Sequence, residues 1–251
     1  MNQIIDTIKE KLIEIEKREN IKILHCVESG SRAWGFPSPD SDYDVRFIYV
    51  RPKEYYLRLD KKRDVIEWQL DETLDINGWD LQKMLRLLHG SNPTVFEWKN
   101  SPIVYKTSDE WKSVSDVIDD YFNAKSGIYH YLSMAKTNYR EYLKGDVVRL
   151  KKYFYVLRPL LSCEYIRKNQ KSPPMLFKNL LCYLDGEVKN EVLKLLELKI
   201  KTSELGEGKA VECINRYIED KILKFDEYAK GMLAFQKPEW DTLNNLFLEI
   251  I

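Results

Sequence analysis

The sequence predicts an α+β fold, in which a small α+β domain is followed by a mostly α-helical domain. Segments with the character of strands lie in the first half of the 251 residues, and helical periodicity takes over from about residue 78. Strands gathered ahead of helices are typical of α+β chains. We therefore expect the α+β domain at residues 1–120 and the helical domain at residues 121–251.

The α+β domain is expected to begin with a helix and to continue with short strands. Apolar residues recur at helical spacing through the first 18 residues, with Lys and Glu between them, which predicts an amphipathic helix. Four later segments are short and rich in β-branched or aromatic residues, and we predict them as strands: 21–27, 43–50, 65–70 and 72–76.

The helical domain contains a basic segment that the total charge conceals. Forty basic and forty acidic side chains give a formal net charge of zero, which argues against a protein that coats nucleic acid by bulk charge. Residues 125–175, however, contain eleven Lys or Arg and three Asp or Glu residues, a local charge of +8. The zero total therefore combines a basic segment with an acidic remainder.

The cysteines and histidines argue against two classes of small stabilised domain. Four Cys and three His are scattered without metal-ligand spacing, so neither a structural zinc site nor a disulfide framework is expected.

No apolar run approaches the ~18 residues that cross a bilayer, and the charged amino terminus does not resemble a signal peptide. We expect a cytoplasmic protein with no membrane partner, and the sequence predicts no oligomeric state.

The stretch from Gly30 to Arg46 carries the residues with the clearest chemistry. Gly30 and Ser31 form a small turn after a buried strand, where backbone N–H groups and a hydroxyl can approach an anion closely. A helix starting at Arg32 would add partial positive charge to the same place. We therefore expect a phosphate-binding turn at Gly30, Ser31 and Arg32.

A carboxylate pair follows this turn. Asp42 and Asp44 are two residues apart on a predicted strand, so their side chains leave the same face. Paired carboxylates repel unless a cation lies between them, and oxygen ligands without His or Cys suit Mg²⁺ or Mn²⁺. A phosphate-binding turn beside such a pair indicates metal-assisted phosphoryl or nucleotidyl transfer, in which two ions roughly 3.5–4 Å apart are typical.

Several motifs extend this pattern along residues 25–180. They are Gly-Ser-Arg-Ala-Trp-Gly-Phe at 30–36, Ser-Asp-Tyr-Asp-Val-Arg at 41–46, Asp-Ile-Asn-Gly-Trp-Asp-Leu at 75–81, Ser-Asn-Pro-Thr-Val-Phe-Glu-Trp at 91–98 and Lys-Lys-Tyr-Phe-Tyr-Val-Leu-Arg-Pro-Leu at 151–160. The eleven-residue interval from Ser31 to Asp42 resembles the signature of the DNA polymerase β-type nucleotidyltransferase superfamily. The full set resembles the predicted bacterial and phage nucleotidyltransferases that include the RNA-ligase-associated, RNA-repair group. This resemblance implies a mixed-sheet, polymerase β-like palm domain.

The resemblance also implies a third carboxylate from a later strand. Asp75, between Leu74 and Ile76, fits the superfamily pattern of an acid between apolar residues, and Glu67 has the same local setting. We favour Asp75 because it also matches the narrower group's motif, and Glu67 remains the alternative. By resemblance, Asp42, Asp44 and Asp75 are the metal ligands, and Asp75 assists in deprotonating the attacking hydroxyl.

Basic residues of the second half are candidates for phosphate contacts. Lys151, Tyr155 and Arg158 share one stripe of a predicted helix, which would suit the β- and γ-phosphates of a nucleotide or a nucleic-acid backbone. A solvated face with surface ion pairs is the alternative. Family resemblance favours the functional interpretation, with Lys152 or Arg158 as the contacts.

The predicted activity is transfer of NMP from a nucleoside triphosphate such as ATP to an acceptor hydroxyl, with Mg²⁺ or Mn²⁺. The RNA-ligase-associated resemblance and the basic segment favour an RNA end as acceptor, and an aminoglycoside-type small molecule is the other acceptor considered. The rival class is an antitoxin-like or regulatory module that binds or acts on a partner protein. A paired-Asp nuclease or phosphatase is disfavoured because the Gly-Ser turn precedes the pair at transferase spacing. Residues 181–251 carry no resemblance that assigns them a role.

Overall fold

A computed structural model describes residues 2–60, 62–69, 73–202 and 206–251. Contacts within the chain divide it into two compact units, neither of which is continuous in sequence. Unit 1 comprises residues 1–33, 42–121 and 237–251, and unit 2 comprises residues 34–41 and 122–236.

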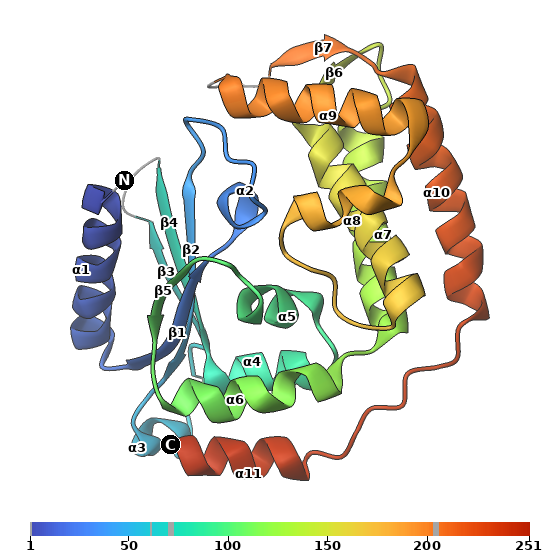
Figure 1. The fold of residues 1–251 in the computed structure, drawn as a ribbon. Helices are drawn as coiled ribbons and strands as arrows, with labels where there is room; N and C mark the ends of the chain where they lie inside the picture. The colour runs from blue at the N-terminus through green and yellow to red at the C-terminus, as the bar shows by residue number, and fades with distance from the viewer. Residues whose placement is uncertain (1, 61, 70–72, 203–205) are drawn as a thin grey trace. The chain divides into compact units, whose positions relative to one another are not determined.

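Unit 1 is built on a five-stranded sheet with the strand order β3-β4-β2-β1-β5. β2 and β4 run parallel and the other neighbouring strands run antiparallel, so the sheet is mixed (Figure 1). Its strands are β1 (Lys22–Glu28), β2 (Tyr43–Val50), β3 (Val65–Gln69), β4 (Leu74–Asp80) and β5 (Val104–Thr107).

The sequence prediction ended the fourth strand too early. β4 continues to Asp80 because residues as far as this one stay paired with β2, where Tyr49 lies opposite Asp80. Helical structure therefore begins at Leu81 and not near residue 78. Asp80 caps the next helix, since its carboxylate accepts a hydrogen bond of 2.8 Å from the backbone N–H of Gln82.

Helices cover both faces of this sheet (Figure 1). The predicted amphipathic helix is α1, and its Ile8, Leu12 and Ile15 pack with Phe47 and Ile76 of the strands. The opposite face meets α5 and α6, where Trp98 contacts Trp79 of β4. The helices of unit 1 are α1 (Asn2–Glu19), α2 (Gly30–Ala33), α3 (Lys53–Tyr56), α4 (Leu81–His89), α5 (Pro93–Lys99), α6 (Glu110–Ile118), the 3₁₀ turn η1 (Asp119–Tyr121) and α11 (Asp241–Ile250).

His25 places a titratable ring in the core of unit 1. The ring is 6% exposed and stacks on Trp111 of α6 with centroids 4.4 Å apart. Burial lowers the pKa of His25 to about 4. Within the described part of the chain its Nε2 has no hydrogen-bond partner, so the folded protein favours the neutral ring.

We therefore expect wild-type protein to lose stability relative to a variant without the His25 imidazole as the pH falls from 6.5 towards 4, because the other titrating groups are common to both proteins. In this window the unfolded chain binds a proton at His25 and the folded chain does not, a slope of at most about 1.4 kcal/mol per pH unit. His25→Phe should remove this slope and keep the stacking on Trp111. Urea unfolding across the pH range checks this, and parallel curves for both proteins below pH 6.5 would contradict it.

Unit 2 is mainly helical. Its core contains residues of α7, α8 and α10 with Phe36, which contacts Phe154 and Phe177 at 5.1 and 5.3 Å between ring centroids. The segment 34–41 is thus part of this unit. The elements are α7 (Ala124–Tyr142), β6 (Val147–Arg149), α8 (Lys152–Asn169), η2 (Phe177–Asn179), η3 (Leu181–Tyr183), α9 (Gly186–Lys201), β7 (Glu207–Lys209) and α10 (Glu212–Gly231), and β6 pairs antiparallel with β7.

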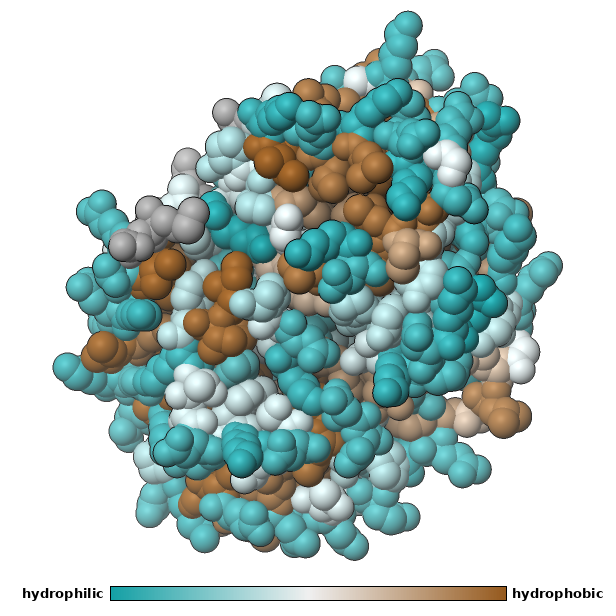
Figure 2. Space-filling view, in the orientation of Figure 1, coloured by the Kyte–Doolittle hydropathy of each residue, from teal (hydrophilic) through white to brown (hydrophobic). Residues whose placement is uncertain are grey.

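The predicted α+β fold class is confirmed. The mixed sheet is formed by strands before residue 108, and the helices of unit 2 follow it in the chain. Among the described residues, every helix is too short or too polar to span a bilayer. The face drawn in Figure 2 is largely hydrophilic, with separate apolar patches such as folded proteins commonly expose.

Candidate functional site

The Gly-Ser turn is tied directly to the strand that carries the carboxylates. Ser29 donates a backbone hydrogen bond of 2.8 Å to the carbonyl of Asp44, and α2 begins at the next residue, Gly30. Gly30 has a φ of +59°, and a Cβ built on it would lie 2.1 Å from Oδ2 of Asp44. The absence of a side chain at Gly30 is therefore what leaves room for the Asp44 carboxylate.

Two of the predicted carboxylates lie side by side on parallel strands. Asp44 of β2 is in register with Asp75 of β4, so their side chains leave the same face of the sheet. Arg46, two residues after Asp44, lies between them. Its Nη2 donates to Oδ1 of Asp44 at 2.9 Å and to Oδ2 of Asp75 at 2.7 Å. One guanidinium nitrogen thus contacts both acids.

Asp42 lies just before the strand that carries Asp44. It is exposed, and its backbone carbonyl accepts a hydrogen bond of 3.0 Å from Nε of Arg32. The Arg32 guanidinium also lies over the ring of Tyr43, 3.7 Å from its centroid. Arg32 is therefore held beside Asp42 and the start of β2, the strand that carries Asp44.

Electrostatics in this group favour a bound cation. Burial raises the pKa of Asp44, the Arg46 charge opposes this rise, and the neighbouring charges of Asp75 and Asp42 add to it. Because Asp44 is harder to ionise and lies near two other acids, any additional positive charge stabilises its charged form. The donors are oxygen atoms only, which suits Mg²⁺ or Mn²⁺.

Glu28 is a buried acid that holds the backbone of Asp44, and the sequence patterns did not identify it as part of the site. Its side chain is fully buried, and Oε1 accepts a hydrogen bond of 2.8 Å from the backbone N–H of Asp44. The hydroxyl of Tyr105 donates to Oε2. Burial raises the pKa of Glu28 to about 7 despite these two donors. Glu28 thus fixes the backbone that presents the Asp44 carboxylate.

In the parts of the chain that the structure describes, no three Asp, Glu, His or Cys side chains form a ready-made metal site. Two carboxylates, those of Asp44 and Asp75, lie side by side, and Arg46 forms an ion pair with each of them. Magnesium usually binds through one or two carboxylates together with substrate phosphates. The donor chemistry therefore fits such a cation, but Arg46 lies between the donors.

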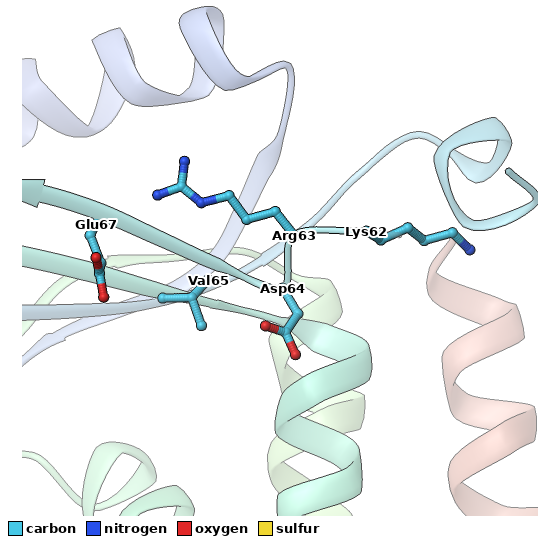
Figure 3. A pocket seen from close by; sticks show the side chains of 5 residues that line it. All are labelled: Lys62, Arg63, Asp64, Val65 and Glu67. Atoms are coloured by element: carbon cyan, nitrogen blue, oxygen red, sulfur yellow. The ribbon is translucent and has the colours of Figure 1, made fainter. Parts of the chain in front are cut away.

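Glu67, the alternative third acid, lies in a different setting. It is on β3, opposite Asn77 of β4 and not opposite Asp44. It lines a cavity of about 390 Å³ together with Lys62, Arg63, Asp64 and Val65 (Figure 3). Asp75, which is 52% exposed and contacts Arg46, is the acid that the structure brings beside Asp44.

The predicted phosphate contacts of unit 2 differ in burial, with Lys151 and Lys152 partly buried and Arg158 fully buried. Lys151 precedes α8 and Lys152 begins it, with the Lys152 ammonium 4.0 Å from the centroid of Tyr142. Arg158, by contrast, is 1% exposed and lies over the ring of Trp34 at 4.7 Å. A solvated face is therefore wrong for Arg158, because its turn of α8 faces the core of unit 2.

Comparison with known families and proteins shows where the chain belongs. A family model described as RlaP, "RNA repair pathway DNA polymerase beta family", matches residues 4–249. The chain belongs to this RNA repair pathway DNA polymerase β family. The resemblance drawn from its motifs is confirmed, and with it the assignment to the nucleotidyltransferases. The match also includes residues 181–249, for which the motifs gave no assignment.

Two individual proteins are similar to this member of the RNA repair pathway DNA polymerase β family. The "Uncharacterized protein YcgL" of Bacillus subtilis (strain 168) is 44% identical over 255 residues, which cover 99% of this chain and 95% of that protein. A crystal structure of a nucleotidyltransferase-like protein from Exiguobacterium sibiricum 255-15 matches with a TM-score of 0.33 and 9% identity, over 97% of this chain and 79% of that one. At that similarity the second match says nothing further about this chain.

Lys199 is a buried cation that the sequence motifs of this RNA repair family member did not reveal. It is 5% exposed and lies on α9 in unit 2. In the described structure its ammonium has one hydrogen bond, to Oγ of Ser38 at 3.5 Å. Burial lowers the pKa of Lys199, and the nearby Asp40 charge opposes this shift. Ser38 belongs to the segment that links the Gly-Ser turn to Asp42.

Lys199→Met is expected to stabilise the unliganded protein. The substitution removes a buried charge with one long hydrogen bond and keeps the packing of the aliphatic stem. A gain of about 1 kcal/mol corresponds to a rise in Tm of roughly 2–4 °C. Lys194→Met on the same helix, where the pair with Glu191 is exposed, should change Tm little. A fall in Tm for Lys199→Met would show that the contact with Ser38 is stabilising.

Proposed function

We propose that the protein transfers an NMP group from a nucleoside triphosphate to the hydroxyl of an RNA end and releases pyrophosphate. The observation that carries the proposal is the placement of Asp44 and Asp75 at one register beside the Gly30 turn. Membership of an RNA repair pathway family supports RNA as the acceptor, as does the local charge of +8 over residues 125–175.

Each residue of the group has a role in this proposal. Asp42 and Asp44 hold a divalent cation, with Asp75 as the third ligand. Such a cation neutralises phosphate charge and lowers the pKa of a bound hydroxyl. The Gly30–Ser31 turn binds a phosphate through backbone N–H groups and the Ser31 hydroxyl, and Arg32 adds positive charge.

Asp75 is proposed as the general base that accepts the proton of the attacking hydroxyl. Its side chain is half exposed, so an acceptor can reach it. A carboxylate within hydrogen-bond reach of a hydroxyl can take its proton as the new bond to phosphorus forms. Lys151 and Lys152 of unit 2 are proposed as phosphate ligands because they are adjacent basic side chains at the start of α8.

The test is transfer of radiolabel from each of the four α-labelled NTPs in the presence of Mg²⁺ or Mn²⁺. RNA with a free 3′ hydroxyl, the same RNA with a blocked 3′ end, an aminoglycoside and a mixture of proteins serve as separate acceptors. We expect label on the free RNA only, and none with the Asp42→Ala/Asp44→Ala variant. The proposal fails if this variant still transfers label, or if wild type labels no RNA with any NTP.

A further inference from the structure

We propose that Arg46 occupies, in the free protein, the place between Asp44 and Asp75 in which the proposed divalent cation binds. Cation binding then requires Arg46 to leave both carboxylates, and a nucleotide assists by offering the guanidinium new anionic partners. The inference rests on the proposed function and adds to it a coupling between cation and nucleotide.

The hydrogen bonds of Arg46 are the observation behind this inference. Besides the two bonds from Nη2 to Asp44 and Asp75, its Nη1 donates to the carbonyl oxygens of Asp75 at 3.0 Å and Val45 at 3.1 Å. The side chain is 17% exposed. Four acceptors around two nitrogens hold the guanidinium in one place, and two of them are the acids that the cation requires.

Guanidinium and a divalent cation cannot both occupy this position. Magnesium binds carboxylate oxygens at about 2.0–2.1 Å in a strict octahedral geometry, and it repels a positive group in contact with the same two acids. The free protein must therefore break the two charged hydrogen bonds from Arg46 to Asp44 and Asp75 before a cation can bind.

A nucleotide changes that balance because its phosphates are alternative partners for Arg46. Arginine binds phosphate oxygens through the same fork of donors that binds carboxylates. A nucleotide that draws Arg46 away leaves Asp44 and Asp75 open to the cation. By thermodynamic linkage each ligand then tightens the binding of the other by the same factor. The cation alone is expected to bind weakly.

The experiment measures binding of Mn²⁺ alone, by electron paramagnetic resonance of the free ion, to wild type and to Arg46→Met. Without the competing guanidinium we expect at least about tenfold tighter binding, which corresponds to about 1.4 kcal/mol. A matched control is Arg58→Met, because Arg58 pairs with Asp60 in an exposed position of the same unit. That variant should bind Mn²⁺ as wild type does.

A second measurement uses an NTP analogue with a non-cleavable α,β bridge. The analogue should tighten Mn²⁺ binding strongly in wild type and much less in Arg46→Met. Arg46→Lys, which keeps one charge without the fork, should lie between the two, and circular dichroism verifies that each variant is folded. Arg46→Met protein should also unfold at a lower temperature in EDTA and regain stability with Mn²⁺.

The two proposals fail in different ways. Equal or weaker Mn²⁺ binding by folded Arg46→Met and Arg46→Lys overturns the competition, and the proposed function stands if label transfer is still observed. An undiminished effect of the analogue in Arg46→Met overturns the coupling. If neither wild type nor the variants bind Mn²⁺ or the analogue, both the inference and the proposed function are wrong.

Discussion

Gly30→Ala is expected to reduce nucleotidyl transfer at least about 100-fold in a protein that still folds. A Cβ at this position would lie 2.1 Å from Oδ2 of Asp44 and 3.0 Å from its Cγ, so the carboxylate must move. Displacement of a reacting group by about 1 Å is enough to cost a factor of 10² in rate. Transfer of label under saturating NTP and metal measures this loss.

Gly186→Ala provides the matched control for that variant. Gly186 has a φ of +51°, close to the +59° of Gly30, but a Cβ on it would meet nothing within 4 Å. Both variants therefore carry the strain of a left-handed alanine, roughly 1–2 kcal/mol, and only one has the clash with Asp44. We expect similar losses of stability and a loss of transfer in Gly30→Ala alone. Equal activity in the two variants would show that Asp44 does not act where it lies.

Asp75→Asn is expected to lower the rate of transfer by about 10²–10⁴, the usual contribution of general acid–base catalysis. Asparagine keeps the shape of the side chain but cannot accept the proton of the attacking hydroxyl. Affinity for the nucleotide should change much less than the rate, because the Gly30 turn and the basic residues remain. Single-turnover kinetics separate the two effects.

Glu67→Gln distinguishes the two acids that the sequence left open. Glu67 lies on β3 and lines a cavity with Lys62 and Asp64, whereas Asp75 is in register with Asp44. Transfer by Glu67→Gln should therefore match wild type within about twofold, a surface substitution being worth at most a few tenths of a kcal/mol. A large loss with Glu67→Gln and none with Asp75→Asn would reverse the assignment.

Local sequence patterns predicted much of unit 1, because the signals for its helices and strands are short-range. The strand at 43–50 is confirmed with the same bounds, since its apolar alternation is complete within eight residues. The end of β4 was wrong because pairing with β2, a contact between distant segments, extends the strand beyond its apolar residues. Similarly, Asp75 and Asp44 share a register that depends on which strands become neighbours.

The residues that sequence reasoning missed are polar groups whose roles depend on burial. Arg46 was given no role in the site, although its spacing of two residues from Asp44 predicts that both side chains lie on one face of the strand. Lys199 falls on the buried face of α9 with Val192 and Leu195, so a lysine at an apolar position was the available signal. Glu28 gave none, because a single acid at the end of an apolar strand is common.

The segment Trp34–Ser41 has a consequence for how this protein can be divided. It lies between the Gly-Ser turn and Asp42 in sequence, yet it packs with unit 2, where Phe177 donates a hydrogen bond of 2.9 Å to the carbonyl of Trp34. The closing residues 237–251 return to unit 1. Cutting the chain at one position therefore cannot separate the two units. A fragment that ends near residue 120 would contain Trp34–Ser41 but would lack the residues of unit 2 against which this segment packs.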